Sequence, residues 1–270
     1  MDKMKAITFF DLDGTLLDGT SQITPEITAA VAALKDNQIL PLIATGRTLC
    51  EIQPIMKDSG IDSAIVMNGQ FIHYEGKTIY SDEFTTEECV SLHEHVKQRG
   101  HELAFYNERR IFCTGHTGTV KQAYDYIHSA VPEIDPTGYE NDAVNMMLVL
   151  SQHGDDDEYY YERFPELTFY RNGPFSIDIV RKGVSKGSGV KNLFNTLGLN
   201  GIPTYAFGDG INDLALFEAC DYGIAMGNAR EELKEKATFI STKNTENGIV
   251  NGLKKFDLLK RKLPSSIDVL

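Results

Sequence analysis

The 270-residue chain lacks several features that mark whole classes of protein. Its four cysteines are scattered and form no Cys-x-x-Cys pair, so we expect reduced thiols and no disulfide framework. No apolar run approaches the roughly 20 residues that a membrane-spanning helix needs. Met1–Lys5 leads directly into an apolar strand, without the long apolar segment of a signal peptide. These absences predict a cytoplasmic protein with no membrane partner.

Positive charge is also scarce. Lysine and arginine total 26 residues against 39 aspartates and glutamates, which gives a formal net charge of -13 and a pI near 5.0. Binding to nucleic acid or to an anionic membrane requires clustered basic residues, so neither partner is expected. An anionic substrate would have to be attracted by local cations. The histidines, including His93, His95 and His101, lack zinc-type spacing and are predicted to lie on solvated faces.

The order of apolar segments predicts an α/β fold with an insertion. Short apolar strands alternate with helical segments near both ends of the chain, which is typical of a doubly wound parallel sheet. Between them, pairs of strands separated by helices indicate a smaller α+β unit. We therefore expect a core made of residues 1–82 and 182–270, with residues 83–181 inserted as a second domain. A final helix is predicted at about 245–260.

The N-terminal strand ends in an unusual pair of acidic residues. Ala6–Phe10 is an uncharged run that reads as a strand buried on both faces, and Asp11 and Asp13 follow it. Two carboxylates this close are costly unless a cation lies between them or one keeps its proton. Gly14 then permits a sharp turn and the close approach of a ligand. An ordinary Asp-rich turn would explain this stretch alone, but not the polar segments described next.

Polar segments follow other predicted strands or open a helix. Thr45-Gly46-Arg47 follows the second strand, Gly208–Asp213 follows a strand near the C-terminus, and Lys186 opens a helix. The carboxyl ends of parallel strands meet along one edge of a sheet, so these groups are expected to lie close together. Carboxylates suggest Mg²⁺, which prefers oxygen ligands, and lysine with helix N–H groups suggests a phosphate.

This combination resembles the haloacid dehalogenase superfamily of phosphotransferases, and most closely its Cof-like sugar-phosphate phosphatases. The motifs that carry the resemblance occur in the family's order: Asp11-Leu12-Asp13-Gly14-Thr15, Thr45, Lys186 and Gly208-Asp209-Gly210-Ile211-Asn212-Asp213. The resemblance covers essentially the whole chain, because the Cof-like group also carries an α/β cap between its second and third motifs. Gly189 departs from the family, which often has a bulkier residue there. Lys182 lies close by, but Lys186 is favoured as the functional lysine because it directly opens the helix.

The resemblance implies a Mg²⁺-dependent phosphatase that acts on a small phosphorylated metabolite. Asp11 would be the nucleophile that forms an aspartyl-phosphate, and Asp13 the general acid and base. The ion would be held by Asp11, the main-chain carbonyl of Asp13 and Asp209, with Asp213 in support or bound through water. The groups implied to bind the phosphoryl oxygens are Leu12 N–H, Thr45, Gly46 N–H, Lys186 and Asn212, and Thr45 and Lys186 also count as catalytic residues.

Several alternatives stay open at the level of sequence. Arg47 either contacts the substrate or pairs with a surface carboxylate, and Asp178 has either a structural role or, less favoured, a substrate contact. A phosphomutase on the same scaffold and a receiver-like phospho-acceptor module are competing functions. A dinucleotide-binding oxidoreductase is weaker, because no Gly-x-Gly-x-x-Gly follows the first strand. The substrate could be a sugar phosphate, a nucleotide or a phosphorylated cofactor, and both a monomer and a homodimer are compatible with the sequence.

Overall fold

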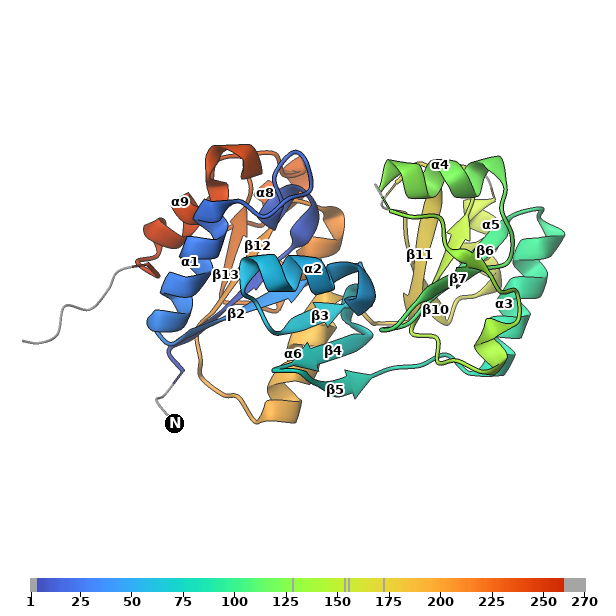
Figure 1. Ribbon diagram of the computed structural model, residues 1–270, viewed down its shortest axis with the longest axis horizontal. Coiled ribbons are helices and arrows are strands. Elements are labelled where there is room, and N and C mark those ends of the chain that lie inside the picture. The colour runs from blue at the N-terminus through green and yellow to red at the C-terminus, as the bar shows by residue number, and fades with distance from the viewer. Residues whose placement is uncertain (1–3, 128, 153, 155, 172, 260–270) are drawn as a thin grey trace, which may run out of the picture.

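The computed structural model describes residues 4–127, 129–152, 154, 156–171 and 173–259, which form two units around separate sheets (Figure 1). The larger sheet has eight strands in the spatial order β14-β13-β12-β1-β2-β3-β4-β5. Their bounds are β1 Ala6–Phe10, β2 Ile39–Ala44, β3 Ala64–Val66, β4 Phe71–Tyr74, β5 Lys77–Ser81, β12 Thr204–Gly208, β13 Tyr222–Ala225 and β14 Phe239–Ile240. We call this part, with its helices, the eight-stranded unit.

Strand β1 lies at the centre of this sheet, where the two ends of the chain meet. It pairs in parallel with β2 on one side and with β12 on the other, so that Phe10 is opposite both Ile43 and Phe207. The strands from β14 to β3 all run parallel, and β4 and β5 add an antiparallel edge. The carboxyl ends of β1, β2 and β12 therefore lie side by side, which is where open α/β sheets bind ligands.

Helices cover both faces of the eight-stranded sheet. Successive residues of a strand point to opposite faces, so Phe9 packs with one set of helices and Phe10 with the other. Helices α1 (Pro25–Asp36), α2 (Leu49–Ser59) and α9 (Gly248–Lys255) cover the Phe10 face. The Phe9 face is covered by α6 (Lys186–Leu197), α7 (Leu214–Glu218) and α8 (Glu231–Lys234).

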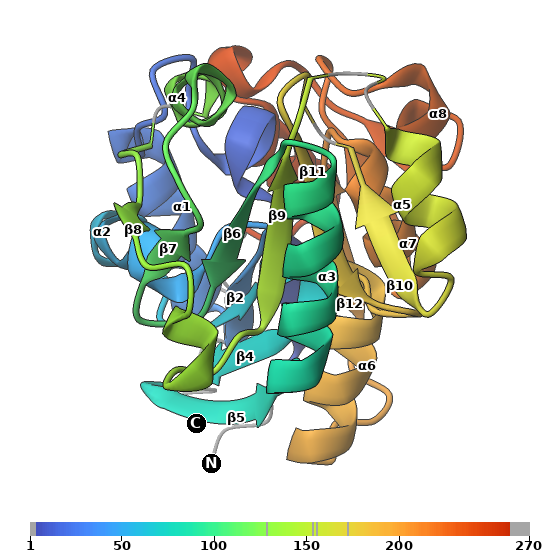
Figure 2. The same ribbon diagram turned by 90° about the vertical axis from the view of Figure 1, so that its right-hand side faces the viewer.

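The second sheet has six strands in the order β10-β11-β9-β6-β7-β8, mostly antiparallel. Their bounds are β6 Glu102–Tyr106, β7 Ile111–Cys113, β8 Glu133–Ile134, β9 Met146–Leu150, β10 Leu167–Tyr170 and β11 Ser176–Arg181. Helices α3 (Thr86–Gln98) and α5 (Asp157–Arg163) cover the face turned away from the larger sheet (Figures 1 and 2). Helix α4 (Gly118–Tyr126) packs on the opposite face. We call this part the six-stranded unit.

One buried side chain joins both chain crossings between the two units. Gln70 follows β3 and is fully buried. Its side-chain carbonyl accepts a hydrogen bond from Arg181 N (2.8 Å), and its amide donates to the carbonyls of Asp82 (3.3 Å) and Asn145. Asp82 lies just after β5 and Arg181 ends β11, so the outgoing and the returning segment are both fixed to Gln70.

The predicted fold class, a doubly wound α/β sheet with an inserted α+β unit, is confirmed, but the predicted start of the final helix is wrong. The final helix is not continuous from residue 245: a short turn at Asn244–Glu246 precedes α9, because Asn247 has a left-handed backbone (φ 58°). The predicted end at Lys260 lies outside the described residues. Within the described ranges, no helix combines the length and apolar character that would carry it across a bilayer.

The predicted solvated histidines are half-buried instead. His93 contacts the hydroxyl of Tyr139 (3.3 Å) and His95 that of Tyr159 (2.6 Å), both in the six-stranded unit. His101 contacts the hydroxyl of Tyr160 (2.8 Å) in the same way. Such pairs join residues distant in sequence, so the spacing of the histidines gave no sign of them. They pack the helices of this unit against one another.

Candidate active site

The site is built around Asp11, at the carboxyl end of the central strand. The backbone N–H of Asp11 still donates to Phe207 O (3.0 Å) of β12, so the residue is held as a continuation of the sheet. The chain then turns through Leu12–Leu16, where Gly14 has a φ of 78°. A Cβ atom on Gly14 would lie 2.4 Å from an Asp209 carboxylate oxygen. Glycine at this position therefore lets Asp209, from the other end of the chain, approach the Asp11 turn.

Lys186 enters the site from the first turn of α6. Ser185 caps this helix, because its hydroxyl accepts from Ser188 N (3.1 Å) while the Ser188 hydroxyl accepts from Ser185 N (2.9 Å). Gly187 allows α6 to press against the neighbouring helix, since a Cβ there would lie 2.0 Å from Ala215 O. A Cβ on Gly189 would likewise meet the Ile65 side chain at 2.5 Å, which explains the small residue at this position.

The Lys186 ammonium lies between two carboxylates and is almost fully buried. Its Nζ donates to Asp11 Oδ1 (2.6 Å) and to Asp213 Oδ1 (2.7 Å). Burial alone would lower the pKa of Lys186, but the charges of these two carboxylates outweigh it and raise the pKa, so the ammonium stays charged. Lys182, by contrast, donates to Pro165 O at the surface. The choice of Lys186 over Lys182 from the sequence agrees with this geometry.

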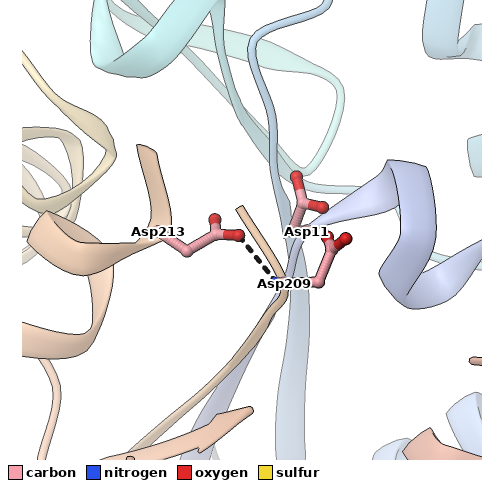
Figure 3. A group of neighbouring side chains, drawn as sticks. All are labelled: Asp11, Asp209 and Asp213. Atoms are coloured by element: carbon pink, nitrogen blue, oxygen red, sulfur yellow. Dashed lines mark hydrogen bonds between the residues drawn. The ribbon is translucent and has the colours of Figure 1, made fainter. Parts of the chain in front are cut away.

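Three carboxylates converge on one point near this ammonium (Figure 3). Oxygen atoms of Asp11, Asp209 and Asp213 all lie within 4.8 Å of one another. Burial raises the pKa of Asp11 well above its usual range, and Asp213 and Asp209 add to the effect while Lys186 opposes it. Burial and the charge of Asp213 raise the pKa of Asp209 to about 6. One lysine thus does not neutralise the cluster, and a bound cation would relieve the repulsion that remains.

Asp213 has a different environment from the other two aspartates. One of its oxygens accepts from Lys186, and the other accepts from the backbone N–H groups of Asp209 and Gly210, both at 3.0 Å. The carboxylate is fully buried. In this arrangement it holds the Asp209 loop and the Lys186 ammonium in place. Asp11 and Asp209 are therefore better placed than Asp213 to coordinate an ion directly.

Asp13 and Arg47 form an ion pair at the mouth of the site. Arg47 Nε donates to Asp13 Oδ2 (2.9 Å) and Nη2 to Asp13 Oδ1 (2.5 Å), in the two-pronged geometry that guanidinium and carboxylate groups favour. Both side chains are partly exposed to solvent. Of the two alternatives for Arg47, the structure shows the pairing with a carboxylate, and that carboxylate is Asp13.

The other predicted residues also gather at this edge of the sheet. Thr45 is buried directly after β2, and its hydroxyl accepts a hydrogen bond from Arg47 N (3.1 Å). Asn212 lies in the loop between β12 and α7, in the same turn as Asp213. Gly46 has the Asn68 side chain beside it, because a Cβ there would lie 3.3 Å from Asn68 Nδ2. All four sequence segments thus meet at the ends of β1, β2 and β12.

Sequence reasoning missed Asn68 as a member of the site. Its side chain is buried and contacts Asn212, with Asn212 Nδ2 at 3.4 Å from Asn68 Oδ1. The signal was present, because Asn68-Gly69 follows a parallel strand just as the other site segments do. An Asn-Gly pair, however, is also a common turn sequence, so it does not by itself indicate a site.

Comparison with known proteins agrees with this geometry. The model of the haloacid dehalogenase-like hydrolase family matches residues 8–253. YkrA of Bacillus subtilis, named as a phosphatase, is 34% identical over 94% of this chain and 98% of its own length. YwtE of the same organism, named a 5-amino-6-(5-phospho-D-ribitylamino)uracil phosphatase, is 28% identical over 91% of this chain and 96% of its own.

Solved structures are similar over the same span. A hypothetical protein of Geobacillus kaustophilus has 34% identity and a TM-score of 0.87, covering 94% of this chain and 99% of its own. The haloacid dehalogenase subclass IIB sugar phosphatase BT4131 has 26% identity and a TM-score of 0.82, covering 94% and 100%. Motifs, strand order and matched span together confirm the resemblance seen in the sequence: the chain belongs to the haloacid dehalogenase-like hydrolases.

Proposed function

We propose that the protein is a Mg²⁺-dependent phosphatase that hydrolyses phosphomonoesters of small metabolites through an aspartyl-phosphate on Asp11. One observation carries the proposal: Lys186 Nζ lies 2.6 Å from Asp11 Oδ1, at the point where three aspartates from distant segments converge. A carboxylate that attacks a phosphoryl dianion needs positive charge beside it, because phosphoryl transfer depends mainly on positioning and charge neutralisation.

Asp11 would act as the nucleophile. One of its oxygens forms a bond to phosphorus while the ester bond to the leaving group breaks, and water then attacks the aspartyl-phosphate and releases inorganic phosphate. Lys186 keeps the attacking carboxylate in a fixed orientation and offsets its charge as the phosphoryl group approaches. The ammonium also donates a hydrogen bond to Asp213, which helps to keep it beside Asp11 during the reaction.

Asp13 would protonate the leaving oxygen and then take a proton from the attacking water. In this structure both of its oxygens accept hydrogen bonds from Arg47. We propose that Asp13 turns from Arg47 towards the leaving oxygen when a substrate is bound. Arg47 would then be released from Asp13 to contact the anionic substrate. Its partial exposure at the mouth of the site leaves room for both arrangements.

The donor set of the cluster fits Mg²⁺, a hard cation that takes oxygen ligands. Asp11 and Asp209 would hold the ion, together with the main-chain carbonyl of Asp13, and Asp213 would support them through its bonds to Lys186 and the Asp209 loop. When bound, the ion would supply positive charge at the phosphoryl oxygens. The remaining phosphoryl contacts are assigned to Leu12 N–H, Thr45, Gly46 N–H and Asn212.

We further propose that residues 83–181 act as a cap that selects the substrate. The six-stranded unit turns one face of its sheet towards the larger sheet and covers the other face with α3 and α5 (Figure 1). A cover of this kind excludes bulk water from the reacting groups and admits the leaving group. The names of the similar proteins, a sugar phosphatase and a ribitylaminouracil phosphatase, support a small phosphorylated metabolite as substrate.

The proposal is tested with p-nitrophenyl phosphate and Mg²⁺. Asp11→Asn should abolish phosphate release, because the amide cannot form the acyl-phosphate. Asp36→Asn, which removes the same charge from the exposed end of α1, should keep activity within about twofold. Unchanged turnover by Asp11→Asn would refute the proposal. Isomer formation without free phosphate from a sugar phosphate would favour a phosphomutase, and a burst that leaves a long-lived phosphoprotein would favour a phospho-acceptor module.

A further inference from the structure

The loop after β13 reaches the proposed metal site from a further parallel strand, next to β12 in the larger sheet. The loop is fixed to the Asp209 segment, because Arg230 N donates to Asp209 O (3.0 Å). Just before this bond, Ala229 N donates to Met226 O (2.9 Å) and closes a turn, with Asn228 at its third position. The carboxyl end of β13 thus places Asn228 at the same edge of the sheet as the site.

The Asn228 carboxamide joins the two segments that are proposed to hold the ion. Its Nδ2 donates to Gly14 O (2.8 Å), in the turn that follows Asp11, and to Asp209 Oδ2 (3.4 Å). Thr15 Oγ1 donates to the other oxygen, Asp209 Oδ1 (3.1 Å). An ionised carboxylate has about four lone-pair positions, so both donors can stay in place while an Asp209 oxygen also binds an ion. The two donors therefore fix the direction of the carboxylate without blocking it.

The oxygen of the Asn228 carboxamide is anchored in the loop before α9. Asn244 N donates to Asn228 Oδ1 (3.0 Å), and Asn244 Nδ2 donates to Leu17 O (2.9 Å), just beyond the turn that follows β1. In Figure 1 these C-terminal segments, in orange and red, lie beside the blue turn after β1. Hydrogen bonds thus lead from Gly14 through Asn228 and Asn244 back to Leu17. Because it is bonded at both its nitrogen and its oxygen, the carboxamide of Asn228 has a fixed orientation.

We propose that Asn228 is a positioning residue for the metal ion, which holds the Asp209 carboxylate and the turn that carries the Asp13 carbonyl in a fixed relation to each other. This inference rests on the proposed Mg²⁺-dependent phosphatase and adds a residue to its site. Mg²⁺ demands nearly ideal octahedral geometry, so a displaced ligand weakens its binding. Groups that orient a metal-binding side chain through hydrogen bonds therefore contribute to affinity, although they do not touch the ion.

The shared donor matters because the atoms that it joins repel each other. Gly14 O and Asp209 Oδ2 are both acceptors with negative charge, and Asn228 Nδ2 donates to both. The Asp209 carboxylate also lies directly against this turn, since a Cβ on Gly14 would be 2.4 Å from Asp209 Oδ2. Without the Asn228 amide, the repulsion would favour arrangements in which the carboxylate moves away from the turn. An ion would then have to bring its ligands together as it binds, at a cost in affinity.

The test is a titration of Asn228→Ala with Mg²⁺. In calorimetry without substrate, the variant should bind Mg²⁺ at least about tenfold more weakly than the intact protein does. With p-nitrophenyl phosphate, the Mg²⁺ concentration that gives half of the maximal rate should rise by a similar factor, while kcat at saturating Mg²⁺ stays within about threefold. Asn228 is exposed, so the melting temperature of the metal-free variant should fall by no more than about 4 °C.

Asn251→Ala is the matched control, because it also removes a carboxamide that donates twice to this part of the chain. Asn251 Nδ2 donates to Thr242 Oγ1 (2.9 Å) and to Glu246 O (3.3 Å), so these bonds stabilise the loop before α9. A loss of packing in this loop should lower the melting temperature in a similar way. The affinity of Asn251→Ala for Mg²⁺ should nevertheless equal that of the intact protein.

The outcomes separate this role from the phosphatase itself. Unchanged Mg²⁺ affinity in Asn228→Ala, an equal loss of affinity in Asn251→Ala, or a loss of kcat that saturating Mg²⁺ does not restore would overturn the positioning role and leave the phosphatase intact. If the intact protein neither bound Mg²⁺ nor released phosphate from p-nitrophenyl phosphate, the proposed phosphatase would be refuted, and this role with it.

Discussion

Each of the two units contains a basic residue beside three carboxylates, in opposite environments. In the eight-stranded unit, Lys186 is surrounded by Asp11, Asp209 and Asp213, and its side chain has no exposed surface. In the six-stranded unit, Arg110 faces Glu133, Asp135 and Asp142, and its side chain is 31% exposed. Arg109 also reaches Asp142 (3.3 Å), and water screens the negative charge that remains around Arg110. Around Lys186, burial excludes water, and burial together with the neighbouring carboxylates raises the pKa values of Asp11 and Asp209.

The difference follows from how the two sheets are built. Parallel strands end at the same edge, so residues following β1, β2 and β12 are forced together even though they are far apart in sequence. Antiparallel strands end at alternate edges, and their side chains gather on faces instead. The larger sheet therefore concentrates reactive groups at one edge, while the smaller one presents Asp178 from the face that it turns towards them.

The largest effect on stability and activity is expected from Lys186→Met, which removes the cation of the buried cluster. The buried carboxylates of Asp11 and Asp213 would lose the cation that they share, so the free energy of unfolding should fall by about 3 kcal/mol. Activity with p-nitrophenyl phosphate should fall by at least about a thousandfold, since charge neutralisation is the main catalytic contribution in such reactions. Urea unfolding and phosphate release measure the two effects.

Lys182→Met is the matched control for this variant. Its ammonium donates to the surface carbonyl of Pro165, so stability should change by about 0.5 kcal/mol or less. Activity should stay within about twofold of the intact protein. If the two variants behaved alike, the contacts of Lys186 with Asp11 and Asp213 would not be what stabilises and activates the site.

A change of pH is expected to have a smaller effect on the stability of the folded protein, and the sign of this effect differs with and without metal. Because the pKa of Asp209 is raised to about 6, the folded protein binds this proton more tightly than the unfolded chain does. Without metal, stability should fall as pH rises from about 4 through 6, and it should stay low above that. Magnesium binds the ionised carboxylates, so it should raise the melting temperature by about 5 °C near pH 7.5 and hardly at all near pH 5.

Asp209→Asn sharpens this prediction. The amide removes one charge from the buried cluster, so the metal-free protein should gain about 1–3 kcal/mol near neutral pH. The same change should abolish the magnesium-dependent shift in melting temperature. Differential scanning fluorimetry at several pH values measures both. A magnesium shift that persisted in this variant would place the ion elsewhere.

The smallest effect is expected from Arg110→Met in the six-stranded unit. Its ion pairs are partly exposed, and its guanidinium also lies over the Phe112 ring at 4.4 Å, so the loss should be about 1 kcal/mol. The loss should shrink at high salt, which screens such pairs. Turnover of p-nitrophenyl phosphate should not change. A large loss of activity would show that this cluster acts on the site from a distance.

The sequence was sufficient for the parts of the fold that depend on local pattern. Apolar runs followed by polar residues identified β1, β2 and β12, and the pattern around Lys186 predicted the helix that it opens. Long-range packing could not be read in the same way. Strand β8, with only two residues, and the histidine–tyrosine pairs depend on contacts between distant segments. Asn68 follows a parallel strand as the other site segments do, but its contacts with Asn212 and Asp178 join segments that no spacing connects.

Gln70 has a mechanical consequence for the whole molecule. The chain leaves the larger unit at Asp82 and returns at Arg181, and both points are bonded to this one side chain. Because both chain connections between the units are bonded to Gln70, we expect the six-stranded unit to move relative to the larger unit mainly by rotation about this residue. Asn68 precedes Gln70 by two residues, and its contact with Asp178 joins the two units at the same place. Any rotation of the six-stranded unit about this junction would therefore displace the Asn68–Asp178 contact less than contacts farther from Gln70.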